Sequence, residues 1–197
     1  MMNPRSSEGV PTRRKLSLIE AAQAKRACQA GLAEPFEPVR FIEHQLPKLV
    51  KGFEFLYDED DPIFVNAPQV QAVVNFDDNP VLIARESIMD AAYRGVPHAR
   101  FVLCHEIAHV FLHRRKATQL ARHTLGSREQ YRTAMPLELE ANLFGGILMV
   151  PPDGVWPGIS VFEVRRAYNC SQQVAEAAIV DAKFWWRASG RKWDAEF

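Results

Sequence analysis

The spacing of apolar and polar residues predicts that the chain begins with helices. Residues 14–31 carry apolar side chains at helical intervals, with Leu16 and Ile19 near one face and Gly31 as the C-cap. A shorter helix is expected over residues 39–46, and the proline that follows should end it. The residues before this helical part are rich in Ser, Pro and Gly and predict an irregular start.

The middle of the chain has a β-type pattern. Short runs of β-branched and aromatic residues occupy 53–57, 72–76 and 81–84, and the sequences DEDDP and DDNP between them are turn signals. Three strands of this length predict one small sheet, antiparallel or mixed.

The pattern becomes helical again from residue 99 onward. Residues 101–112 are mostly apolar and predict a buried helix, and residues 137–149 predict a second strong helix that two prolines stop. Residues 114–135 are basic and weakly periodic, which favours a loop with a little helix, and 158–190 read as a small helical tail. The pattern therefore predicts helices before and after one short sheet.

Length and composition add that this is an ordinary globular chain. Its 197 residues are 47% hydrophobic and 24% charged. We expect an N-terminal leader and helix over 1–34, a central domain over 35–157 and a helical tail over 158–197. The chain has no apolar run of the ~20 residues that a membrane helix needs, and no signal peptide is expected. Three widely spaced cysteines indicate reduced thiols and therefore a cytoplasmic location.

The segment FVLCHEIAHVFLH contains an H-E-x-x-H motif on the predicted buried helix. His105 and His109 are four residues apart, so they project from one helix face about 6 Å apart. That spacing allows both imidazoles to bind one zinc ion. Glu106 directly follows the first histidine, where a carboxylate can act as the general base of a zinc peptidase.

A catalytic zinc normally has a third protein ligand, and the sequence offers two candidates. His113 lies about 12 Å from His105 along an unbroken helix, which favours a pocket-rim or capping role. Glu138 could serve instead, with Asn142 on the same face accepting the free N–H of a ligand histidine. Alternatively, Glu138 and Glu140 are surface charges near a helix N-terminus, and Glu140, about 200° from Glu138, is expected to face solvent.

These segments resemble the ImmA/IrrE-type zinc metallopeptidase family. The resemblance rests on IARESIMDAAYRGVPHARFVLCHEIAHVFLH at 83–113 and on ELEANLFGGILMVP at 138–151, which is similar to the family's E-x-x-A-[ND]-x-F-A helix. VFEVRRAYNCSQQVAEAAI at 161–179 is similar to the helix-turn-helix-like tail that often follows. The resemblance extends over residues 35–185.

The resemblance implies the fold class α+β, as a small zincin-like metallopeptidase domain built from a short sheet, an active-site helix and a third-ligand helix. It implies that His105, His109 and Glu138 are the Zn²⁺ ligands and that Glu106 is the general base. The implied activity is hydrolysis of a specific protein substrate, typically a helix-turn-helix transcriptional repressor of a mobile element or stress-response system. The oxyanion donor would be a His or Tyr outside the ligand set, and His113, His123 and Tyr131 remain open as candidates.

Several positions depart from the family pattern without removing a catalytic atom. Gly145 stands where Ala is usual, Ile147 where Glu is common and Val150 where Met is common. These departures concern local packing and the substrate groove. Cys104 is expected to be a buried thiol that points away from the two histidines.

Charge is distributed unevenly although the formal net charge is zero. Residues 52–99 hold nine acidic and two basic residues, whereas 100–132 hold seven basic and two acidic residues. In related zincins these segments border the substrate groove, so one acidic and one basic wall are expected, with the Asp58–Asp61 run steering a basic substrate. Overall neutrality excludes a uniformly basic nucleic-acid binder.

Two other function classes compete with the peptidase. The protein could be a non-catalytic anti-repressor or a toxin–antitoxin-like binding protein that retains a zinc site, although such a protein has no need of Glu106. It could also be a DNA-binding regulator that uses its tail. Residues 161–179 contain only Arg165 and Arg166 as basic residues, which argues against a phosphate-contacting face.

Overall fold

The fold is mixed α+β with a small three-stranded sheet. The computed structural model describes residues 9–76, 79–113, 128–191 and 193, and only the backbone of residues 128–134. Strands β1 (Glu54–Tyr57), β2 (Ala72–Asn75) and β3 (Val81–Ala84) form a sheet in the order β1-β3-β2. β1 runs parallel to β3 and β2 runs antiparallel to it, so the sheet is mixed. The predicted α+β class and all three strands are confirmed.

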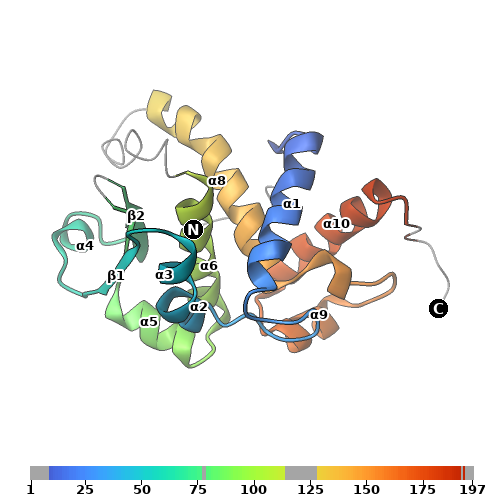
Figure 1. Ribbon diagram of the computed structural model, residues 1–197, viewed down its shortest axis with the longest axis horizontal. Helices are drawn as coiled ribbons and strands as arrows, with labels where there is room; N and C mark the ends of the chain where they lie inside the picture. Colours follow the sequence, from blue (N-terminus) through green and yellow to red (C-terminus); the bar gives the residue numbers. More distant parts are fainter. Residues whose placement is uncertain (1–8, 77–78, 114–127, 192, 194–197) are drawn as a thin grey trace.

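Helix α6 (Pro97–Leu112) packs on the sheet through β2 and on α8 (Figure 1). It begins with a proline at its first turn, where the missing N–H has no helical partner to lose. Both its faces are buried, because β2 and α5 (Glu86–Tyr93) pack on one side and α8 on another. This burial explains why the segment is apolar on all sides rather than amphipathic.

Helix α8 (Arg128–Met149) packs more extensively on α6 than any other element does. The sequence predicted a helix from residue 137 only, and that start is wrong because the helix continues through Pro136. A proline inside a helix costs one hydrogen bond and a steric clash, about 3 kcal/mol, but does not always end the helix. The two helices touch at Gly145, where an added Cβ would lie 3.1 Å from backbone atoms of Cys104 and His105.

Helix α1 (Thr12–Arg26) lies against α8 (Figure 1). Its buried face carries Leu18, Ile19 and Ala22, whereas Leu16 is only partly buried. The helix ends five residues before the predicted C-cap Gly31. The Arg26 guanidinium is buried and donates to the carbonyl oxygens of Leu148 and Gly31, and these bonds hold the chain as it leaves the helix.

The remaining helices are short, apart from the last. Pro47 was expected to end the helix before it, but it lies in the first turn of the next helix, α3. A proline is tolerated there because the N–H that it lacks has no partner in the helix. They are α2 (Pro38–His44), α3 (Leu46–Leu49), α4 (Pro62–Asn66), the 3₁₀ turn η3 (Pro152–Gly154), α9 (Val161–Tyr168) and α10 (Gln172–Ala188).

The C-terminal helices are joined to the N-terminal part by specific contacts. The Tyr168 hydroxyl, at the end of α9, lies 2.8 Å from the Leu32 carbonyl oxygen and 3.0 Å from that of Gly154. Lys15 of α1 forms an ion pair with Asp181 of α10 at 2.7 Å. The domain boundaries near residues 34 and 157 stay predictions.

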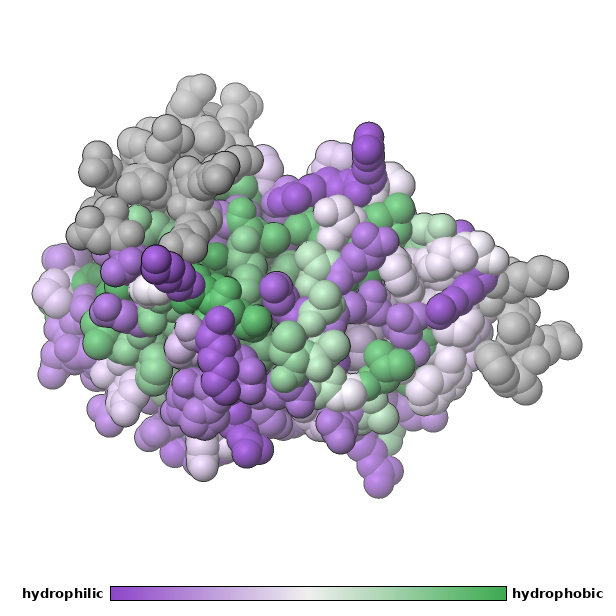
Figure 2. Space-filling view, viewed as in Figure 1, coloured by the Kyte–Doolittle hydropathy of each residue, from purple (hydrophilic) through white to green (hydrophobic). Residues whose placement is uncertain are grey.

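The surface differs between the two halves of the molecule. Figure 2 shows apolar side chains gathered on the half that holds the sheet and α6, with a more polar or mixed surface toward α9 and α10. Within the described residues, none of the helices combines the length and the apolar character that crossing a bilayer requires.

Candidate metal centre

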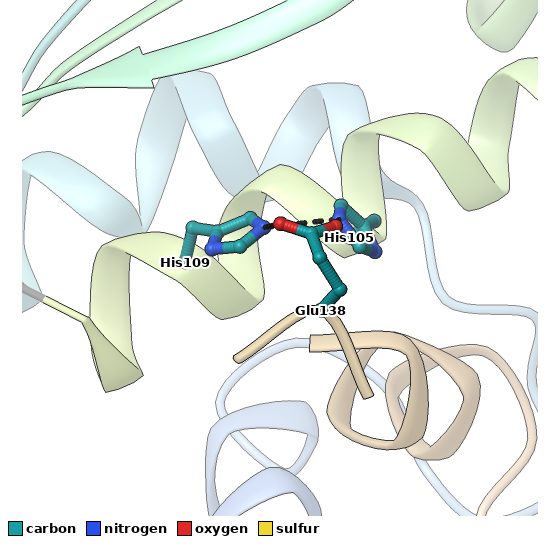
Figure 3. Close-up of side chains that lie close together, drawn as sticks. All are labelled: His105, His109 and Glu138. Carbon is teal, nitrogen blue, oxygen red and sulfur yellow. Dashed lines mark hydrogen bonds and ion pairs between the residues drawn. The ribbon is translucent and has the colours of Figure 1, made fainter. Parts of the chain in front are cut away.

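The two histidines of the motif lie one turn apart on α6 and direct their Nε2 atoms to the same point (Figure 3). The Nε2 atoms of His105 and His109 are 3.0 Å apart. The side chain of His105 is 1% exposed and that of His109 is 13% exposed. The surrounding helix is buried, which fixes the direction of both imidazoles.

Glu138 reaches this point from α8, with its carboxylate between the two imidazoles (Figure 3). Its Oε2 lies 3.1 Å from His105 Nε2, and its Oε1 lies 3.5 Å from His109 Nε2. Ligand atoms of these three residues all fall within 4.8 Å of one another. The Glu138 side chain is 44% exposed, so solvent reaches the centre from this side.

Asn142, one turn after Glu138 on α8, fixes the orientation of His105. Its Oδ1 lies 2.9 Å from His105 Nδ1. An amide oxygen only accepts hydrogen bonds, so His105 must carry its proton on Nδ1. The Nε2 lone pair is then directed at Glu138 and His109, as a metal ligand requires. This contact is the one that the shared helix face of Glu138 and Asn142 predicted.

The structure decides one prediction and corrects another on the opposite side of the centre. Of the two roles predicted for His113, it has the capping one: it is the C-cap residue of α6, and with 1% exposure it does not line a pocket rim. Its Nδ1 lies 2.8 Å from His109 Nδ1. Glu140 does not face solvent: its side chain is 17% exposed and forms two hydrogen bonds with Arg14 of α1. A helical wheel misses this contact because α1 is distant in sequence.

Burial and mutual charge shift the pKa values of the three residues in different directions. Burial, together with the neighbouring His105, lowers the pKa of His109 to about 3, which keeps this imidazole neutral. Burial acts against the ionised forms of Glu138 and His105, yet their mutual hydrogen bond and charges outweigh it. The pKa of Glu138 therefore falls to about 2, and that of His105 rises. One anionic carboxylate between two imidazoles is a donor set suited to Zn²⁺.

Glu106 is buried beside the ligand cluster. Only 5% of the residue is exposed, and burial raises the pKa of its carboxyl group to about 8, with the Glu138 charge acting in the same direction. A cation held by the neighbouring donors would favour the carboxylate form again. A carboxyl group whose pKa lies near neutrality is suited to both taking up and releasing a proton.

Cys104 precedes His105 on α6 but is separate from the cluster. It is fully buried, and burial raises the pKa of its thiol to about 12. A protonated thiol is a poor metal ligand. The expectation of a buried thiol is confirmed, and Cys28 and Cys170 are free thiols as well.

The candidates for the oxyanion donor are not equally placed. Both ring nitrogens of His113 face other residues, His109 on one side and Glu140 on the other, so His113 has no nitrogen directed at a substrate. His123 lies outside the described residues, as does the side chain of Tyr131.

The acidic run before α4 contains residues with structural contacts. Glu59 pairs with Arg85 at 3.1 Å and accepts a hydrogen bond from the Ser87 backbone N–H. Asp61 caps α4 by accepting from the Ile63 N–H. Asp58 accepts from the Asp60 N–H, so three of the four carboxylates of the run have structural contacts. The basic side chains expected on the opposite wall lie largely outside the described residues.

Two histidines from one helix, a glutamate from a second helix and an adjacent buried glutamate together define a candidate metallopeptidase centre. Residues 71–155 match the family model Peptidase_M78, described as the IrrE N-terminal-like domain. The match covers less than half of the chain, and it supports the resemblance to the ImmA/IrrE-type metallopeptidase family found in the sequence. The match contains every residue of the cluster. No curated protein and no solved structure gave a significant match.

Proposed function

We propose that the protein is a zinc-dependent endopeptidase that cleaves a specific protein, a helix-turn-helix transcriptional repressor of a mobile element or stress-response system. The observation that carries the peptidase proposal is the cluster of His105, His109 and Glu138 beside Glu106, within the segment that matches a peptidase family. The repressor as substrate rests on the family resemblance.

The residues present fit a zinc ion. His105 and His109 would hold it through their Nε2 atoms, and Glu138 through its carboxylate, which leaves a fourth position for water or substrate. When bound, zinc supplies Lewis acidity toward the scissile carbonyl and makes water more acidic.

The Glu106 carboxylate then has two tasks. It accepts a proton from the attacking water as the water oxygen bonds to the carbonyl carbon. It passes this proton to the leaving amide nitrogen as the C–N bond breaks. The burial of Glu106 supports both steps, because the surrounding apolar residues exclude bulk water that would compete for the proton.

A zincin-like mode of substrate binding is consistent with the position of β2. This strand pairs with β3 on one side, has no strand on the other side among the described residues, and packs on α6. An extended peptide can add to such an edge through backbone hydrogen bonds. The bound peptide would then lie beside α6, the helix that carries the histidines, with its scissile bond near the metal centre.

The test is cleavage of a candidate repressor by the wild type and by Glu106→Gln. The purified protein should contain about one zinc per chain. On co-expression with a repressor from a neighbouring gene, the wild type should yield fragments. Glu106→Gln should bind zinc but lose about 10²–10⁴-fold in rate, since general-base catalysis contributes that factor. Glu20→Gln, an exposed change on α1, is the matched control and should cleave as the wild type does.

Other outcomes identify the alternatives. Equal cleavage by Glu106→Gln would overturn the mechanism. Zinc binding with an intact repressor that co-purifies with the protein would indicate the anti-repressor or toxin–antitoxin-like function. A shifted DNA band with the isolated protein would instead support the DNA-binding regulator.

A further inference from the structure

A line of side-chain contacts runs from His109 away from the metal centre to the N-terminal helix. His109 Nδ1 lies 2.8 Å from His113 Nδ1. His113 Nε2 lies 3.5 Å from Glu140 Oε2. The Glu140 carboxylate accepts two hydrogen bonds from Arg14 of α1, from Nε at 2.8 Å and from Nη2 at 2.6 Å. The line thus joins α6 and α8 to α1, which is far from both in sequence.

The protonation of these groups sets the direction of hydrogen-bond donation, which runs from His109 toward Glu140. If His109 binds metal through Nε2, its proton lies on Nδ1. Two ring nitrogens 2.8 Å apart share one proton, so His109 donates and His113 Nδ1 accepts. The proton of His113 then lies on Nε2, which is buried, has no hydrogen-bond partner among the described residues and faces Glu140 Oε2 at 3.5 Å. With neutral imidazoles and an ionised Glu140, this N–H is directed at a carboxylate oxygen.

Arg14 is the group that holds Glu140 in place. Its guanidinium engages both carboxylate oxygens as a fork, a geometry that fixes the carboxylate plane. The helix that carries it is itself anchored, since Lys15 pairs with Asp181 and Gln23 donates to Asp153. These contacts hold the helix that carries Arg14 against α10 and η3.

We propose that Arg14, Glu140 and His113 are positioning residues for His109. The N-terminal helix α1 would then help to orient a ligand of the metal centre. The inference deepens the proposed function and rests on it, because it assumes that His109 is a ligand. His105, in contrast, is oriented by Asn142 from the same helix that supplies Glu138.

The experiment measures zinc affinity by competition with a chromophoric chelator, and the visible absorption of the Co²⁺-loaded protein. Partners of ligand histidines contribute about 10–100-fold to metal affinity. Glu140→Gln should weaken zinc binding by about 10-fold or more and change the Co²⁺ spectrum. Arg14→Gln should weaken it by about 3–10-fold, and Arg14→Lys should restore part of the loss by keeping the charge without the fork.

Arg13→Gln is the matched control, because it removes the same charge one residue away on the exposed face of α1 and should leave affinity and spectrum unchanged. Circular dichroism and the urea midpoint of the metal-free variants separate a positioning effect from misfolding. Arg14 is 41% exposed at its side chain, so its replacement leaves the core intact even if Glu140→Gln does not fold.

The outcomes distinguish this inference from the function on which it rests. Wild-type affinity and spectrum in folded Arg14→Gln and Glu140→Gln would overturn the positioning role and leave the metal centre standing. A wild type that binds neither zinc nor Co²⁺ would overturn the proposed function itself. Weaker binding in both variants, with Arg13→Gln unaffected, would establish the role of α1.

Discussion

The two histidines of the centre lie one turn apart on the same helix but have different supports. His105 is 1% exposed, and its Nδ1 contacts Asn142 of α8 directly. His109 is 13% exposed, and its Nδ1 contacts His113, which leads through Glu140 to α1. The contacts that orient His105 involve only α6 and α8, whereas those that lead from His109 also involve α1.

The difference shows how a metal site can depend on both near and distant parts of a chain. Asn142 acts through the same helix face as Glu138, so one packing contact between α6 and α8 sets both a ligand and its partner. On the His109 side, Arg14 must be brought in by the docking of α1. The His105 side should therefore tolerate changes in α1, and the His109 side should not.

The largest expected effect comes from removal of either histidine. His105→Ala and His109→Ala should each weaken zinc binding by more than the 100-fold that marks the upper range for partner residues, because a ligand itself is lost. The two losses should be similar, since the supports differ but the ligand roles do not. Competition titration with a chelator measures both.

His98→Ala is the control for these substitutions. It removes an exposed histidine from the first turn of the same helix, where the ring contacts Gln71. We expect zinc affinity to stay at the wild-type value. Near-normal affinity in His109→Ala would mean that His109 is not a ligand, and the comparison between the two supports would lose its basis.

A smaller effect is expected from Asn142. Asn142→Ala removes the acceptor for the His105 Nδ1–H and should weaken zinc binding about 10–100-fold. Asn142→Asp keeps an acceptor in place and should retain most of the affinity. The Co²⁺ spectrum should change in the first variant only. If Asn142→Ala binds zinc as tightly as the wild type does, the ring of His105 is held by packing alone.

The His105 side could be predicted from the sequence because its determinants are local. A four-residue spacing places His105 with His109 on one helix, and the same spacing places Glu138 with Asn142 on another. The three strands were also predictable, since β-branched runs between turn signals are a local property.

The rest of the structure depends on contacts between distant segments. Glu140 was expected to face solvent because a helical wheel describes one helix and cannot show that Arg14 packs there. Helix α1 ends at Arg26, whose side chain donates to the Leu148 carbonyl oxygen of α8, a contact that the local pattern cannot show. The start of α8 was misplaced because Pro136 is a local stop signal that the helix nevertheless accommodates.

The smallest expected effect compares two adjacent glycines of α8. A Cβ on Gly145 would lie 3.1 Å from backbone atoms of Cys104 and His105, whereas a Cβ on Gly146 would meet nothing within 4 Å. Gly146→Ala should raise the free energy of unfolding by about 0.5–1 kcal/mol, because alanine favours the helix. Gly145→Ala should gain little or lose about 1 kcal/mol, because backbone atoms of α6 cannot move aside as a flexible side chain would.

The zinc affinity of the two glycine variants tests whether Gly145 sets the distance between α6 and α8. Gly145 lies two helical turns after Glu138, so an alanine that widens the spacing of α6 and α8 would shift Glu138 away from His105. We expect Gly145→Ala to weaken zinc binding a few-fold and Gly146→Ala to leave it unchanged. Urea unfolding and chelator competition test the two effects separately. Equal stabilisation by both alanines, with unchanged affinity, would show that the alanine usual in the family fits here too and that Gly145 does not set the distance between the helices.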